Sequence, residues 1–324
     1  MQFQVPIQIK PFDTPVTYRD NILLIGSCFT EHIGNYLGEM KFNVLQNPNG
    51  ILFDPMGVCN SLVSYMENRQ YTTADLFELN EAWHSWMHHS RFSNIDAAEG
   101  VRIINESQQQ AHAFLQKADW LIITLGSSFV YKLREGGRDV VNCHKAPAQW
   151  FNKHLSSIEE IVTALDGTLH RLFHFNPHVK VIFTISPVRH IRDGVVDNNR
   201  SKARLIEAVH HLVNKLDRLY YFPAYELVID VLRDYRFFDI DMVHPNYPAT
   251  QFVLEHFTAS CLDKDTQALM EEIRSIVIAR KHKPFHPTSK QHQTFLQKHL
   301  EKAERLQQQH PYLHLAEEMQ FFRQ

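Results

Sequence analysis

The chain has 324 residues, of which 44% are hydrophobic, and 33 basic against 36 acidic side chains give it a formal net charge of -3. It can bury a core in one large domain or two smaller ones, and its charge gives no reason to expect nucleic acid or an anionic membrane as a partner. The N-terminus lacks the features of a signal peptide, and no apolar run reaches the length of a membrane span, so we expect a cytoplasmic protein. Because no zinc or redox motif occurs, we expect free thiols and no need for a metal or other cofactor.

The first element is an apolar run, Asn21 to Ile25, that ends in Gly26-Ser27 and precedes a predicted helix. A serine held at such a strand-to-helix turn can attack an acyl carbon once a histidine takes its proton. The same pair is often only a turn. The chain contains neither a phosphate-binding glycine loop nor the G-x-S-x-G elbow of the alpha/beta-hydrolases.

Three further runs are predicted to be strands, namely Trp120 to Leu125, Val179 to Ile185, and a short one near 219–222. Helical patterns separate them at about 157–173 and 201–216, and residues 58–118 are mostly helical and polar, as in an insertion or cap. Alternating strands and helices predict a three-layer α/β/α sandwich with a mostly parallel sheet. Ligands bind at the carboxyl ends of the strands in such sheets.

Residues 130–142 are predicted to form a hairpin that turns at Gly136-Gly137. The returning arm would carry Asn142-Cys143-His144-Lys145 back toward the strand ends. Asn142 or its neighbour His144 is therefore expected to face the same cleft as Ser27.

Near the end of the main domain stands Asp241-x-x-His244, followed by Pro245. A carboxylate at that spacing can bond one ring nitrogen of His244 and leave the other free as a base. The alternative is a helix-capping aspartate and a turn histidine. From about residue 283 the chain becomes charged and glutamine-rich with helical spacing, which predicts a helical extension. The extension is expected to pack on the body or on another subunit. An oligomer formed through this C-terminal helix is therefore one of the two alternatives.

A serine after the first strand and a late D-x-x-H resemble the SGNH/GDSL hydrolases. Gly26-Ser27-Cys28-Phe29-Thr30 is similar to the name-giving motif of one branch, the GSCFA family, with Thr30 in place of the usual alanine. Further similar blocks, in order along residues 15–260, are Asn47 to Ile51, Asn142 to Lys145, Ser186 to His190, Asn199 to Ala203 and Leu232 to Phe237. The resemblance implies an SGNH-hydrolase-like fold with flavodoxin-like strand order over residues 1–282, and an extension at 283–324.

By that resemblance, Ser27 is the nucleophile, His244 the general base and Asp241 the acid that orients it. Cys28 is a rival nucleophile, but Ser27 matches the motif position better. The backbone N–H groups of Ser27, Gly50 and Gly126 would bind the oxyanion. SGNH enzymes usually add an asparagine soon after the third block's glycine, and here the sequence is Gly126-Ser127-Ser128. Either Ser127 or Ser128 donates instead, or Asn142 reaches in from the hairpin.

Four more side chains, His144, Lys145, Arg189 and His190, follow predicted strands and would bind an anionic or hydroxyl-rich group of the substrate, or else form a structural polar network. The resemblance implies hydrolysis of an ester of a small molecule or carbohydrate, with an O-acetyl group on a carbohydrate as a family-level suggestion. Two alternatives stay open: an acyltransferase that uses the same serine, and a non-catalytic binding protein on the same fold.

Overall fold

The computed structural model describes residues 5–323, and a five-stranded sheet forms its centre. The strands are β1 (Asn21–Gly26), β2 (Asn43–Gln46), β5 (Trp120–Leu125), β9 (Lys180–Ile185) and β10 (Leu219–Tyr221). They are all parallel, in the order β10-β9-β5-β1-β2. This is the flavodoxin-like order, whose ligand crevice lies between the first strand and the third, here β1 and β5. The predicted α/β class and strand order are confirmed.

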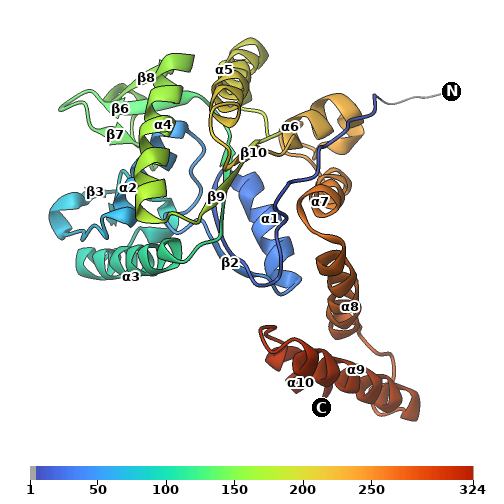
Figure 1. Ribbon diagram of the computed structural model, residues 1–324. Helices are drawn as coiled ribbons and strands as arrows, with labels where there is room; N and C mark the ends of the chain where they lie inside the picture. Colours follow the sequence, from blue (N-terminus) through green and yellow to red (C-terminus); the bar gives the residue numbers. More distant parts are fainter. Residues whose placement is uncertain (1–4, 324) are drawn as a thin grey trace.

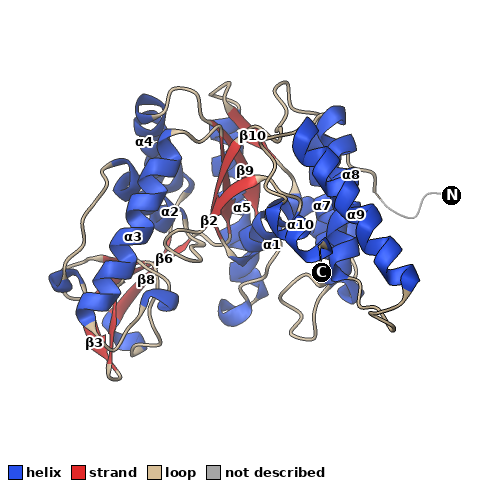
Figure 2. Cartoon of the chain, turned by 90° about the horizontal axis from the view of Figure 1, so that it is seen from below, coloured by secondary structure: helices blue, strands red, loops and turns tan. Residues whose placement is uncertain are grey.

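Alternate residues of the strands face opposite sides of the sheet, and each side is buried under helices. Ile22 and Leu24 pack with α1 (Cys28–Glu39), α7 (Tyr247–Cys261) and α8 (Lys264–Lys281). Leu23 and Ile25 pack with α2 (Pro55–Met66), α3 (Ala97–Gln116), α4 (Ile158–Phe175) and α5 (Val195–Val213). Figure 2 shows the sheet between α2, α3 and α4 on one side and α1, α7 and α8 on the other. Because both faces are covered, β1, β5 and β9 are nearly continuous apolar runs.

Segment 58–118 differs from the expected insertion or cap. Val58 and Leu62 of α2, with Ala111 and Leu115 of α3, belong to the core against the sheet, so these helices form part of one outer layer. Only the part between them projects, as a hairpin of β3 (Phe77–Leu79) and β4 (Ala82–His84). Most of the surface of α3 is polar and faces outward, and only a narrow apolar stripe of the helix packs on the core.

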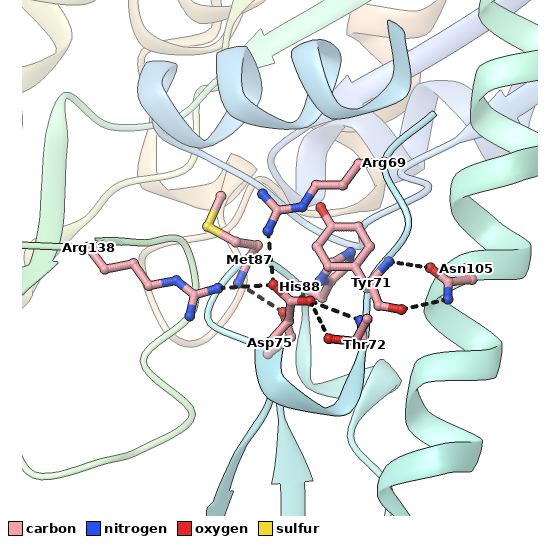
Figure 3. A network of polar contacts seen from close by, with 9 residues as sticks. Arg69, Tyr71, Thr72, Asp75, Met87, His88, Asn105 and Arg138 are labelled. Atoms are coloured by element: carbon pink, nitrogen blue, oxygen red, sulfur yellow. Dashed lines mark hydrogen bonds and ion pairs between the residues drawn. The ribbon is translucent and has the colours of Figure 1, made fainter. Parts of the chain in front are cut away.

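A polar network anchors the base of this projection (Figure 3). The Asp75 carboxylate forms an ion pair with Arg69 at 2.9 Å and lies 3.9 Å from the Arg138 guanidinium. Tyr71 exchanges two backbone hydrogen bonds, of 2.8 and 2.9 Å, with the side-chain amide of Asn105 on α3. Each charge has a partner here, so the cluster has a structural explanation.

The predicted hairpin at 130–142 is confirmed. Strand β6 (Phe129–Leu133) pairs with β7 (Asp139–Val140), and the turn glycines adopt φ values of 76° and 64°. A third strand, β8 (Phe151–Leu155), pairs with the other edge of β6 and was not predicted.

The C-terminal helices α9 (Lys290–Gln309) and α10 (Ala316–Phe322) follow α8 and a linking segment that contains the predicted boundary at 282/283 (Figure 1). Leu306 and Phe322 join the core that contains α1. The Glu318 carboxylate, 2% exposed, pairs with Lys41 at 2.6 Å and Arg280 at 2.7 Å. The extension thus packs on the body of the same chain. None of the described helices is both long and apolar enough to cross a membrane.

Candidate active site

Gly26 and Ser27 form the turn from β1 into α1. Gly26 has φ 147°, and a Cβ there would lie 2.2 Å from Thr124 O, so only glycine fits between β1 and β5. Ser27 is the N-cap of α1, and its Oγ accepts a hydrogen bond from Phe29 N–H at 3.3 Å. The hydroxyl therefore lies at the positive end of a helix, at the carboxyl edge of the sheet.

Asp241 and His244 are joined as the D-x-x-H spacing predicts. The His244 ring donates from Nδ1 to Asp241 Oδ2 at 2.7 Å, and Asp241 Oδ1 accepts the backbone N–H groups of Val243 and His244 at 2.9 and 3.0 Å. These bonds lower the pKa of Asp241 to about 2, and the bond from the His244 ring has the largest effect. With the proton on Nδ1, Nε2 of His244 carries the lone pair that a base requires.

The two halves of the predicted triad approach the same helix without joining. In the described part of the chain, no hydrogen bond links Ser27 Oγ to His244. His244 lines a cavity of about 660 Å³ together with His32 and Asn35, which lie on the first turns of α1 after Ser27. The predicted bond between Ser27 and His244 is thus not made in this arrangement.

Each backbone N–H that the sequence predicts for the oxyanion hole already has an acceptor inside the protein. The bonds run from Ser27 to Thr124 O (3.0 Å), from Gly50 to Asn47 O (2.7 Å), and from Gly126 and Ser127 to Phe53 O (2.8 and 2.9 Å). These groups hold the strand ends and the 47–53 loop together, and they are not free to bind a substrate oxygen.

The side chains weighed as replacements for the missing asparagine are also engaged. The hydroxyls of Ser127 and Ser128 are buried and lie 3.3 and 3.1 Å from Ser201 Oγ. Asn142 accepts from His144 N–H at 2.9 Å and donates to Ser90 Oγ at 3.4 Å.

Asn142 and His144 line a second cavity of about 650 Å³, at the hairpin, together with Lys145 and Phe53. His144 is 8% exposed, and its ring bonds Ser85 O at 2.8 Å, so its part is structural. Burial first of all lowers its pKa to about 4. Lys145 is exposed at the rim, and Phe53, which also lines the cavity, packs against Gly126.

Arg189 binds the protein's own loop, as in the structural polar network that was the alternative to substrate binding. Its guanidinium donates to Met242 O at 3.2 Å and lies 3.9 Å from the ring centroid of Phe238. Its backbone N–H donates to Val243 O at 3.2 Å. Arg189 therefore holds the loop that carries Asp241 and His244.

His190, by contrast, faces Ser27. A Cβ built on Gly126 would lie 3.2 Å from His190 Nε2 and 3.3 Å from Ser27 Cβ, closer than ordinary contact, so both side chains pack close against the glycine. Burial, and next the positive charge of Lys202, lower the pKa of His190 to about 4. The imidazole is therefore neutral at neutral pH.

Lys202 is the residue that the sequence analysis did not single out. It is 2% exposed, and its Nζ donates to Gly126 O at 2.5 Å and to Ser186 O at 2.6 Å. Burial lowers its pKa to about 7. A signal existed, because Lys202 falls three residues before Leu205 on the apolar stripe of α5.

Burial also raises the pKa of the Cys28 thiol, which disfavours the thiolate that a cysteine nucleophile needs. Among the described residues, no group of three or more His, Cys, Asp or Glu is placed to hold a metal ion.

A family model described as "GSCFA family" matches residues 21–257, and one described as "GSCFA domain protein, C-terminal domain" matches residues 273–324. No curated protein sequence matches.

A carbohydrate esterase family 3 structure from Talaromyces cellulolyticus is 10% identical with a TM-score of 0.37 and covers 79% of this chain and 99% of its own. A mutant acetyl esterase with acetate ion is 12% identical with a TM-score of 0.34 and the same two coverages. An acetyl xylan esterase from the rumen bacterium Butyrivibrio proteoclasticus is 13% identical with a TM-score of 0.36 and covers 76% of this chain and 64% of its own.

Proposed function

The chain belongs to the GSCFA family, and we propose that it is a serine esterase in which Ser27 attacks the acyl carbon and His244 accepts the serine proton. The observation that carries this proposal is the Asp241–His244 pair, whose 2.7 Å bond leaves Nε2 as the basic nitrogen beside the helix that Ser27 caps. The proposal requires a movement of the 239–246 loop, which Arg189 holds, that brings Nε2 to the serine hydroxyl.

The proposed reaction has two matching halves. Ser27 Oγ gives its proton to His244 Nε2 while the Oγ–C bond forms and the carbonyl electrons move to oxygen. When the carbonyl re-forms, the C–O bond to the alcohol breaks, and the departing oxygen takes the proton from His244. Water then attacks the acyl-serine in the same way, and the carboxylic acid and free Ser27 are released. Asp241 holds the imidazolium in place throughout.

We propose an O-acetylated carbohydrate as the substrate class. The hairpin cavity supports this, because the aromatic rings of Tyr131 and Phe151 lie there beside the polar side chains of Asn142 and Lys145. Such a mixed lining suits the flat faces and hydroxyl groups of a sugar.

A non-catalytic binding protein is the competing function, and the absence of a Ser27–His244 hydrogen bond in the described chain favours it. Turnover of p-nitrophenyl acetate by the wild type and by Ser27→Ala separates the two. We expect Ser27→Ala to lose nearly all turnover above the uncatalysed rate.

The matched control is Ser289→Ala. Ser289 caps α9 as Ser27 caps α1, so both variants lose a helix cap worth about 1 kcal/mol. Ser289→Ala should keep wild-type turnover. Equal turnover in Ser27→Ala and the wild type would contradict the esterase, and product that forms only with an added sugar acceptor would identify an acyltransferase instead.

A further inference from the structure

We infer that the His190 side chain donates the hydrogen bond to the substrate's carbonyl oxygen that SGNH enzymes take from the asparagine missing here. This inference rests on the proposed function and adds a catalytic residue to it. The predicted backbone donors, and the side chains of Ser127, Ser128 and Asn142, all have partners within the protein, whereas the ring of His190 lies across Gly126 from Ser27.

Position is the first argument. The carbonyl under attack must lie next to Ser27 Oγ, and its oxygen must meet donors about 2.7–3.1 Å away. His190 Nε2 and Ser27 Cβ border the same space over Gly126, at 3.2 and 3.3 Å from the point where a Cβ would be. The point also lies 2.9 Å from Phe53 Cβ, so an acyl group on Ser27 Oγ would have the His190 imidazole as a neighbour only after Phe53 moves aside.

Availability is the second argument. In the described part of the chain, neither ring nitrogen of His190 makes a hydrogen bond, although the residue is only partly exposed. Its backbone N–H donates to Asn198 Oδ1 at 2.9 Å, and its ring lies 5.3 Å from that of Phe53, centroid to centroid. The residue is thus fixed on both sides while the ring nitrogens stay free for a ligand.

Charge is the third argument, and it separates His190 from a base. The groups that act on its ring are Lys202, Asp193, His244 and Lys153, and burial with the Lys202 ammonium favours the neutral form. An imidazole with a pKa this low is a weak base, but its N–H remains a good hydrogen-bond donor.

The test compares His190→Ala and His190→Asn with the wild type, using p-nitrophenyl acetate over a range of pH. We expect His190→Ala to lower kcat about 100- to 1000-fold, the effect of losing one oxyanion donor. His190→Asn replaces the ring with an amide N–H and should recover at least about tenfold of that loss. The acid limb of the pH–rate profile should not move, because His244 remains the base. His112→Gln, which removes another partly buried imidazole on α3, should leave kcat unchanged.

Three results would overturn the inference: turnover in His190→Ala within about threefold of the wild type, no recovery in His190→Asn, or an acid limb that moves or disappears, which would make His190 the base. Far-ultraviolet circular dichroism of each variant checks that it is folded, and His190→Asn keeps the test decisive if the alanine variant is not. A wild type without Ser27-dependent turnover would overturn the proposed function and this inference together, whereas an active His190→Ala would overturn this inference alone.

Discussion

Replacing Gly126 with alanine tests whether the space between Ser27 and His190 is the reaction site. The new Cβ would lie 2.9 Å from Phe53 Cβ, a distance that real Cβ atoms do not show, and 3.2 and 3.3 Å from His190 Nε2 and Ser27 Cβ. Phe53 must shift, and the other two side chains must give by a few tenths of an ångström. Overpacking of this kind destabilises the fold by about 1–3 kcal/mol.

The effect on turnover should be larger than the effect on stability. A methyl group between nucleophile and oxyanion donor displaces the acyl group, and a displacement of about 1 Å can cost about 100-fold in rate. We therefore expect kcat of Gly126→Ala for p-nitrophenyl acetate to fall about 100-fold, while urea unfolding still shows a folded protein. Gly167→Ala is the control, because nothing lies within 4 Å of a Cβ there, and alanine in α4 should stabilise the fold by about 0.5–1 kcal/mol. Wild-type turnover in Gly126→Ala would refute the placement of the reaction over this glycine.

Three further changes test other parts of the site. Because the pKa of Lys202 falls from its usual 10.5 to about 7, the folded state binds fewer protons than the unfolded state between these values, so wild-type stability should rise with pH there. Lys202→Met lacks that rise, so the difference in unfolding free energy between the wild type and the variant should grow by up to about 4 kcal/mol in favour of the wild type from about pH 7 to pH 10, as measured by urea unfolding. A difference that stays constant with pH would contradict the lowered pKa of Lys202. Asp241→Asn replaces the Oδ2 acceptor that fixes the His244 tautomer with an amide group that donates, and should lower kcat at least about 100-fold with little change in unfolding free energy; an unchanged kcat would remove Asp241 from the mechanism. Arg189→Ala frees the 239–246 loop and should lower kcat about tenfold with KM nearly unchanged, whereas a rise in KM alone would return Arg189 to substrate binding.

Most of the sheet could be predicted because a parallel sheet buried on both faces is written as continuous apolar runs. Strands β1, β5, β9 and β10 appear as such runs, whereas β2 is short, half-exposed and bears asparagine and glutamine, so its sequence carries no such signal. The helices α2 and α3 looked like a cap because a helix that covers a sheet needs only a narrow apolar stripe, and the rest of its surface is polar.

The candidate site also has a part that the sequence predicts and a part that it does not. The Asp241–His244 bond is local, because three residues of loop fix it, and the spacing alone predicted it. The acceptors for the Gly126 and Ser127 N–H groups and for the Asn142 amide come from segments far away in the sequence, and no local pattern shows that these donors are already engaged. His190 was predicted to contact substrate only because it follows a strand; its position opposite Ser27 depends on the packing of three loops over Gly126.

Direct identification of the acyl-enzyme tests the central claim, that Ser27 is the nucleophile. The protein is mixed with p-nitrophenyl acetate, quenched with acid within the first turnovers, digested, and sequenced by tandem mass spectrometry, which separates Ser27 from its neighbour Cys28. We expect an acetyl group on Ser27 that is absent from Ser27→Ala and forms far more slowly in His244→Ala, where the serine lacks its base. An acetyl group on Cys28, or turnover without any modification of Ser27, would contradict it.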